Sequence, residues 1–189
     1  MSTGLIYNLY NDKRTVFTLQ EIAMLLNESD NQKLKQRLNY YVRTRKLKNP
    51  RRGIYTKENY SVEELACKVF KPSYISLEYV LQKAGVVFQY DTKITNISYL
   101  SRTLSIDNTS YVYRKIKNEI LYHSTGIITN DNGISIATPE RAFLDTLYLN
   151  REYFFDTTEN LDRERILSIL PIFQSGQLTK RVQKVLNND

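Results

Sequence analysis

The sequence predicts an α+β protein made of two domains, residues 1–60 and residues 61–189. Helical and strand spacings of apolar residues both occur along the chain, which is the pattern of a mixed fold. A length of 189 residues fits one large domain or two small ones, and the charge distribution favours two. The net charge of +7 lies wholly in residues 1–60, whereas residues 61–189 hold 15 basic and 15 acidic side chains.

Composition excludes several classes of protein. Hydrophobic residues make up 41% and charged residues 25%, which is typical of a globular chain. A single cysteine, Cys67, forms no intramolecular disulfide, and with a single histidine we expect neither a metal site nor a cofactor. The longest apolar runs are far shorter than the ~20 residues that span a bilayer, and the first residues do not resemble a secretory signal. These features predict a cytoplasmic protein without a membrane partner.

The first third of the chain contains well-marked helix starts. Residues 5–10 favour a short helix, and residues 15–17 favour an extended segment. Thr18 and Glu21 have the spacing of a capping box, which opens a helix over residues 19–27. Asp30 is placed to cap the next helix, residues 31–46.

The helix over residues 31–46 has one apolar and one cationic face. When successive residues are placed 100° apart around a helix, one buried stripe results, with Arg45 close to it. Its members are Leu34, Leu38, Tyr41 and Val42. The opposite face contains no acid, and its members are Gln32, Lys33, Gln36, Asn39, Tyr40 and Arg43, flanked by Arg37 and Thr44. Amide, guanidinium and phenol groups are the ones that read base edges and hold phosphates.

A basic hairpin is expected directly after this helix. In residues 47–56, Pro50 and Gly53 flank the pair Arg51-Arg52, and β-favouring residues follow. Helix, turn, basic helix and basic hairpin is the order of a winged helix-turn-helix. The expected fold is therefore an N-terminal winged helix-turn-helix followed by a mixed α/β C-terminal domain.

Charge and order together predict a nucleic-acid interface in residues 1–60. Residues 31–60 carry 10 basic side chains against the single acid Glu58. We expect one group to face the major groove of duplex DNA: Lys33, Gln36, Arg37, Tyr40 and Arg43. We expect a second group to contact phosphates or the minor groove: Arg45, Lys46, Lys48, Arg51 and Arg52. An RNA-binding module would use the same charges and remains an alternative.

The second domain is expected to alternate helices and strands. Ser61 with Glu64 predicts a capping box for a helix ending near Phe70, and Ser76 is expected to cap a helix over residues 77–84. Residues 93–116 have the pattern of strands with a turn at residues 107–108. A hairpin is expected over residues 121–136, and helices are expected from Pro139 onwards, over residues 162–170 and at the C-terminal end.

No residues in this domain form a convincing catalytic site. Cys67 is expected to be a buried structural thiol, and His123 structural or exposed. Arg141 and Asp145 are spaced as an ordinary ion pair on a helix surface. The chain lacks a glycine-rich phosphate loop and an acidic cluster, so we expect no enzyme; a nuclease is the enzymatic alternative. Lys180, Arg181 and Lys184 are expected to be solvated, with a second DNA contact left open.

Three segments resemble the AbiEi family. These are residues 52–55 (RGIY), residues 74–77 (YISL) with Ala84-Gly85, and residues 137–145 (ATPERAFLD). Each is short, but their order and spacing cover roughly residues 15–149. Members of this family are antitoxin-repressors of type IV toxin–antitoxin systems linked to abortive phage infection.

The resemblance implies a function for each domain. The N-terminal winged helix would repress its own operon by binding operator repeats upstream of it. The C-terminal domain would act as the antitoxin against a nucleotidyltransferase-like toxin encoded next to it, without a direct complex being required. A stand-alone transcriptional regulator without antitoxin activity is the alternative.

Overall fold

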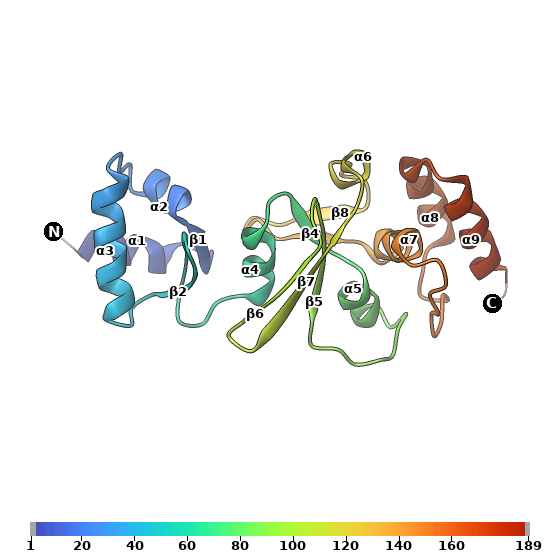
Figure 1. Ribbon diagram of the computed structural model, residues 1–189, viewed down its shortest axis with the longest axis horizontal. Coiled ribbons are helices and arrows are strands. Elements are labelled where there is room, and N and C mark those ends of the chain that lie inside the picture. Colours follow the sequence, from blue (N-terminus) through green and yellow to red (C-terminus); the bar gives the residue numbers. More distant parts are fainter. Residues whose placement is uncertain (1–2, 188–189) are drawn as a thin grey trace. The chain divides into compact units, whose positions relative to one another are not determined.

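The computed structural model describes residues 3–187 and has a mixed α+β fold with two separate sheets (Figure 1). The α+β class expected from the sequence is therefore confirmed. The chain forms two compact units, one up to Val69 and one from Phe70 onwards. The boundary lies at Val69 rather than at residue 60, because helix α4 (Val62–Val69) packs on strand β1 of the N-terminal unit.

The N-terminal unit joins helices to a small antiparallel sheet. Its elements before α4 are α1 (Thr3–Asn11), β1 (Val16–Thr18), α2 (Leu19–Leu25), α3 (Asn31–Arg43), β2 (Lys48–Arg51) and β3 (Ile54–Thr56). The strand order is β1-β3-β2, with both pairings antiparallel. One apolar core joins these elements, formed by Leu5, Leu9, Phe17, Ile22, Leu34, Leu38, Tyr41, Leu47 and Tyr55.

Local capping fixes where α2 and α3 begin. The Thr18 hydroxyl accepts from the Glu21 N–H at 3.2 Å, and the Glu21 carboxylate accepts from the Thr18 N–H at 2.8 Å. This confirms the first capping box. Asp30 accepts from the N–H groups of Gln32 and Lys33, both at 3.0 Å, as expected. The start of α3 is thus satisfied by its own flanking residue.

The end of α3 differs from the prediction. The helix stops at Arg43, and Arg45 has a left-handed backbone with φ +57°. The Arg45 N–H donates to Val42 O at 3.1 Å and the Lys46 N–H donates to Tyr41 O at 2.9 Å. This is the hydrogen-bond pattern of a Schellman motif, in which glycine usually takes the left-handed position. Because α3 ends at Arg43, Arg45 lies outside the helix, and its side chain is exposed.

The expected basic hairpin is present as β2 and β3. Arg51 pairs with Ile54, and Gly53 turns the chain with φ +81°. Pro50 has no N–H to give to the ladder. The Asn49 side-chain amide supplies hydrogen bonds at this point instead, donating to Arg51 O at 2.9 Å and to Ile54 O at 2.6 Å. A side-chain amide therefore holds the hairpin where the backbone does not.

The C-terminal unit has a six-stranded mixed sheet with helices packed against it. The strand order is β6-β7-β5-β4-β9-β8, in which β5–β7 and β4–β9 are parallel pairs. The strands are β4 (Ser73–Ile75), β5 (Ile94–Ser98), β6 (Arg102–Ile106), β7 (Thr109–Lys115), β8 (Ile127–Thr129) and β9 (Ser135–Ala137). The helices are α5 (Glu78–Lys83), α6 (Asn118–Leu121), α7 (Pro139–Leu149), α8 (Arg163–Ile169), the 3₁₀ turn η1 (Leu170–Phe173) and α9 (Gly176–Leu186).

Helix α7 lies in the centre of this unit. Figure 1 shows it between the sheet on one side and α8 and α9 on the other. Every residue from Glu140 to Leu147 is buried, so the helix has no solvent-facing side there. The predicted surface ion pair of Arg141 and Asp145 was therefore wrong, because both side chains are fully buried.

The predicted cap of α5 was also wrong, because the Ser76 side chain binds a distant partner. Ser76 donates to the Asp145 carboxylate at 2.8 Å instead of capping α5. The Tyr79 N–H at the start of α5 donates to the Thr95 hydroxyl at 3.0 Å, and Leu77 before it has φ +60°. The predicted capping box of Ser61 and Glu64, in the N-terminal unit, forms only in part and is described below.

Other expectations for the C-terminal unit are confirmed. Asp107 and Asn108 have φ +46° and +65° between antiparallel β6 and β7, as a tight hairpin turn requires. The hairpin turned at residues 130–133 forms β8 and β9. His123 is exposed, and in the N-terminal unit Cys67 is buried in α4.

Candidate nucleic-acid interface

The outward face of α3 carries the first group of predicted contact residues. Lys33, Gln36, Tyr40 and Arg43 are all exposed, whereas Leu34 and Leu38 of the same helix are fully buried. The helical wheel therefore assigned the two faces correctly. The Tyr40 ring meets the Tyr41 ring edge-on with a centroid distance of 5.5 Å, which places an exposed phenol against a buried one.

Arg37 is less available than the other members of this group. It is half-buried, and its Nη1 lies 3.6 Å from the Glu28 carboxylate in the turn before α3. Any phosphate or base that Arg37 contacts has to compete with this carboxylate. Among the residues that the structure describes, Arg43 has no carboxylate within ion-pair distance, so its guanidinium is the more accessible of the two.

A shallow depression of about 490 Å³ lies on the same side of α3. Its lining contains Gln36, Asn39, Val42 and Arg43. Asn39 was placed on the outward face but was not selected as a contact residue, although it lies three positions after Gln36 and four before Arg43. Val42 was assigned to the buried stripe, yet it is half-buried and offers an apolar surface between the amides and the guanidinium.

The second predicted group extends from the end of α3 to the hairpin tip. Arg45, Lys46, Arg51 and Arg52 are exposed. Lys48 is half-buried, and its Nζ lies 3.0 Å from the Glu58 carboxylate, so part of its charge is neutralised within the unit. The Leu19 N–H at the start of α2 donates to Gly53 O at the hairpin tip at 3.0 Å. The predicted residues are thus divided between the outward face of α3 and the segment from Arg45 to the hairpin tip.

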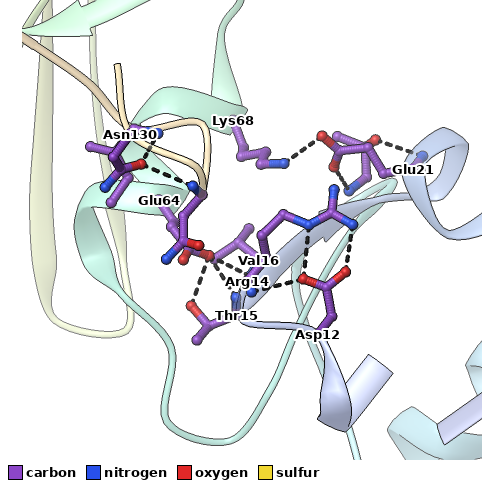
Figure 2. A network of polar contacts seen from close by, with 11 residues as sticks. Asp12, Arg14, Thr15, Val16, Glu21, Glu64, Lys68 and Asn130 are labelled. Atoms are coloured by element: carbon purple, nitrogen blue, oxygen red, sulfur yellow. Dashed lines mark hydrogen bonds and ion pairs between the residues drawn. The ribbon is translucent and has the colours of Figure 1, made fainter. Parts of the chain in front are cut away.

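Buried charged side chains of helix α4 join it to β1 and to α2 of the same unit (Figure 2). The Glu64 side chain is buried, and its carboxylate accepts from the N–H groups of Thr15 and Val16 at 2.7 and 2.8 Å and from the Thr15 hydroxyl at 2.9 Å. Glu64 therefore does not complete a capping box with Ser61, although the Ser61 hydroxyl accepts from the Glu64 N–H at 3.2 Å. Its carboxylate fixes the start of β1 instead.

A second contact joins α4 to α2. The buried Lys68 ammonium pairs with Glu21, the same carboxylate that caps α2. Glu21 thus links Thr18, the N-cap residue of α2, to α4 (Figure 2). Sequence reasoning missed both roles, because each pairs residues more than 40 positions apart.

Internal pairing separates the scaffold cations from the exposed ones. Arg14 donates to the Asp12 carboxylate at 2.6 to 3.0 Å, and these hydrogen bonds lower the pKa of Asp12 below its usual value. Lys57 donates to the backbone carbonyls of Tyr10 and Asp12. These cations hold the fold, whereas Lys33 and Arg43 on α3 and Arg52 at the hairpin tip have exposed side chains.

The described residues contain no group of three or more His, Cys, Asp or Glu side chains arranged to hold a metal ion. Within residues 3–187, no helix combines the length and the apolar character needed to cross a bilayer. No protein-family model matches the chain, and no curated protein matches its sequence.

Proposed function

We propose that the N-terminal unit is a winged helix that binds duplex DNA in a sequence-specific manner. Helix α3 would enter the major groove, and the β2–β3 hairpin would contact phosphates or the minor groove. One observation carries the proposal: residues 31–56 contain no acid, and most of their cations are exposed on α3 and along the segment from Arg45 to the hairpin tip. Such a surface repels itself unless an anionic partner neutralises it.

The α3 face also has the groups that distinguish base pairs. Arg43 can donate two parallel hydrogen bonds to guanine, and Gln36 and Asn39 can each bind adenine through two bonds. The apolar side of Val42 fits the methyl group of thymine. Lys33 and the hydroxyl of Tyr40 are suited to phosphate oxygens. A binding site with this mixture reads sequence, whereas lysines alone would bind any duplex.

The family resemblance extends the proposal to a biological role. Residues 52–55, 74–77 and 137–145 support a repressor that regulates its own toxin–antitoxin operon and counteracts a nucleotidyltransferase-like toxin. The role needs no catalytic step from this chain. Co-expression with the product of the adjacent gene tests the antitoxin part, because growth should be restored only when this chain is present.

The DNA-binding proposal is tested by the salt dependence of affinity for the chain's own upstream DNA. If about six phosphates are contacted, log K should fall against log salt with a slope near −5. Replacing Arg51 and Arg52 with alanine should flatten the slope by roughly two units. The matched control is Lys115→Ala with Lys117→Ala, two exposed cations of the C-terminal unit, which should leave the slope unchanged.

Single-stranded RNA in the same assay separates the two classes of partner. Tighter binding to single strands than to the upstream duplex would favour the RNA-binding alternative. A slope near zero for the duplex would exclude an electrostatic interface altogether.

A further inference from the structure

A separate group of cations surrounds a pocket in the C-terminal unit. The pocket has a volume of about 390 Å³ and is formed by the end of α7, residues 151–154 and α9. This volume lies in the range of roughly 300–1,000 Å³ that is usual for small-molecule sites. The winged-helix proposal assigns no role to it.

Three cations line the pocket. Arg151 and Lys184 are exposed, and Arg181 is half-buried. Arg181 is held in place, since its Nη1 donates to Leu147 O at 2.9 Å and its Nη2 donates to Gln177 Oε1 at 3.4 Å. Among residues 3–187, none of the three cations has a carboxylate within ion-pair distance. The pocket therefore has a net positive charge, with Glu152 as the acid in its lining.

Aromatic and apolar groups lie beside these cations. The Phe154 side chain is 83% exposed, which is unusual for a phenylalanine in a pocket wall, and Val185 and Leu147 add apolar surface. The Tyr153 ring packs against Phe155 with a centroid distance of 4.9 Å. Burial, together with the nearby carboxylates of Glu78 and Asp156, raises the pKa of Tyr153 to about 12, so its hydroxyl remains a hydrogen-bond donor.

We propose that this pocket binds a nucleoside phosphate, with the phosphate among Arg151, Arg181 and Lys184 and the base stacked on Phe154. A simple inorganic anion would not stack on the exposed aromatic ring, and an apolar ligand would not pair with the three cations. A nucleotide has both a π-face and a charge to match. A free nucleotide and the phosphorylated end of a single strand share this chemistry.

The experiment titrates the full chain with two probes. One is adenosine diphosphate with a fluorescent N-methylanthraniloyl group, and the other is a 5′-phosphorylated oligothymidine labelled at its 3′ end. Whichever probe binds more tightly identifies the source of the nucleotide. Lys184→Gln should weaken binding by about fivefold or more, because a charged hydrogen bond is lost. The matched control is Lys180→Gln, which removes the same charge one turn earlier on α9, outside the pocket lining, and should change affinity by less than about twofold.

Two further variants test the base and the charge separately. Phe154→Ala should weaken both probes by about fivefold or more while leaving competition by inorganic pyrophosphate unchanged. Glu152→Gln should tighten binding, because it removes a negative charge facing the phosphate. Both residues are exposed, so the variants should retain the native melting temperature.

Several outcomes would overturn the proposal. These are no saturable binding of either probe, an equal loss for Lys180→Gln and Lys184→Gln, or a Phe154→Ala variant with unchanged affinity. The double variant Arg51→Ala with Arg52→Ala should bind the adenosine diphosphate probe normally. A loss there would place the nucleotide on the hairpin and exclude this pocket.

Discussion

The two units of the chain use arginine in opposite ways. In the N-terminal unit, Arg43 and Arg52 are exposed on α3 and at the hairpin tip. In the C-terminal unit, Arg141 is fully buried, and its guanidinium donates to Asp145, to the Tyr74 hydroxyl at 2.8 Å and to the carbonyl oxygens of Ile120 and Thr125 at 2.9 and 2.8 Å. The first set is directed to solvent, and the second joins the core.

The difference shows what the charge distribution along the sequence means. The C-terminal unit, from Phe70 onwards, has 14 basic and 13 acidic side chains, and its central cation is satisfied inside the fold. The N-terminal unit satisfies Arg14, Lys57 and Lys68 internally, and it pairs Arg37 with Glu28 and Lys48 with Glu58. The side chains of Lys33, Arg43 and Arg52 are exposed. This exposed positive charge is accessible to a polyanion, which is why we propose that this unit binds DNA.

The largest expected effect concerns the buried arginine. Arg141→Met should destabilise the chain by about 3–5 kcal/mol, because Asp145 is left buried without its cation. Burial raises the pKa of Asp145, and Arg141 opposes this rise. Without Arg141, folded Asp145 binds a proton at higher pH than unfolded Asp145 does, so stability is lost as the pH rises. Urea unfolding followed by circular dichroism should thus show a smaller penalty near pH 4 than near pH 8.

The control for this prediction is an exposed arginine of the same unit. Arg102→Met on the edge strand β6 should change the free energy of unfolding by less than about 0.5 kcal/mol. If both substitutions had the same small effect, the buried network would not stabilise the fold as its geometry indicates.

Sequence reasoning succeeded where the deciding partner is close along the chain. Thr18 and Glu21 lie three residues apart, and their capping box was predicted correctly. Glu64 has the same spacing from Ser61, but its carboxylate binds Thr15, which is 49 positions away. A competing partner brought near by folding cannot be read from local spacing.

The same limit explains the error at Arg141 and the partial success at the α3 face. The i, i+4 spacing of Arg141 and Asp145 shows that they are neighbours, but it does not show whether other elements cover the helix. On α3, the apolar stripe is on one side only, so the exposed face could be predicted. The pairing of Arg37 with Glu28 depends on the path of the turn before the helix, which the residue pattern leaves open.

The next effect compares two arginines of α3. Arg43→Ala should weaken binding to the specific operator by about 1–3 kcal/mol relative to random duplex, because a guanidinium that reads a base is lost. Arg37→Ala should cost less, because Glu28 already neutralises part of its charge. Fluorescence anisotropy with operator and scrambled duplexes measures both. Equal losses of Arg43→Ala on the two duplexes would assign Arg43 to phosphate contact, and Glu28→Gln should tighten binding only if Arg37 faces the DNA.

The smallest expected effects concern Arg45 and distinguish the contribution of its charge to DNA binding from the cost of its left-handed backbone to stability. A non-glycine residue in the left-handed region costs roughly 1–2 kcal/mol, so Arg45→Gly should raise the free energy of unfolding by about 1 kcal/mol. The same variant should flatten the salt dependence of DNA binding by about one unit, because one phosphate contact is lost. Arg45→Ala is the matched variant, since it removes the charge but keeps the strained backbone; it should show the flatter slope without the gain in stability. A glycine variant that is more stable and binds DNA with an unchanged slope would mean that Arg45 only terminates α3, and the phosphate contacts would then have to come from the remaining cations of the hairpin.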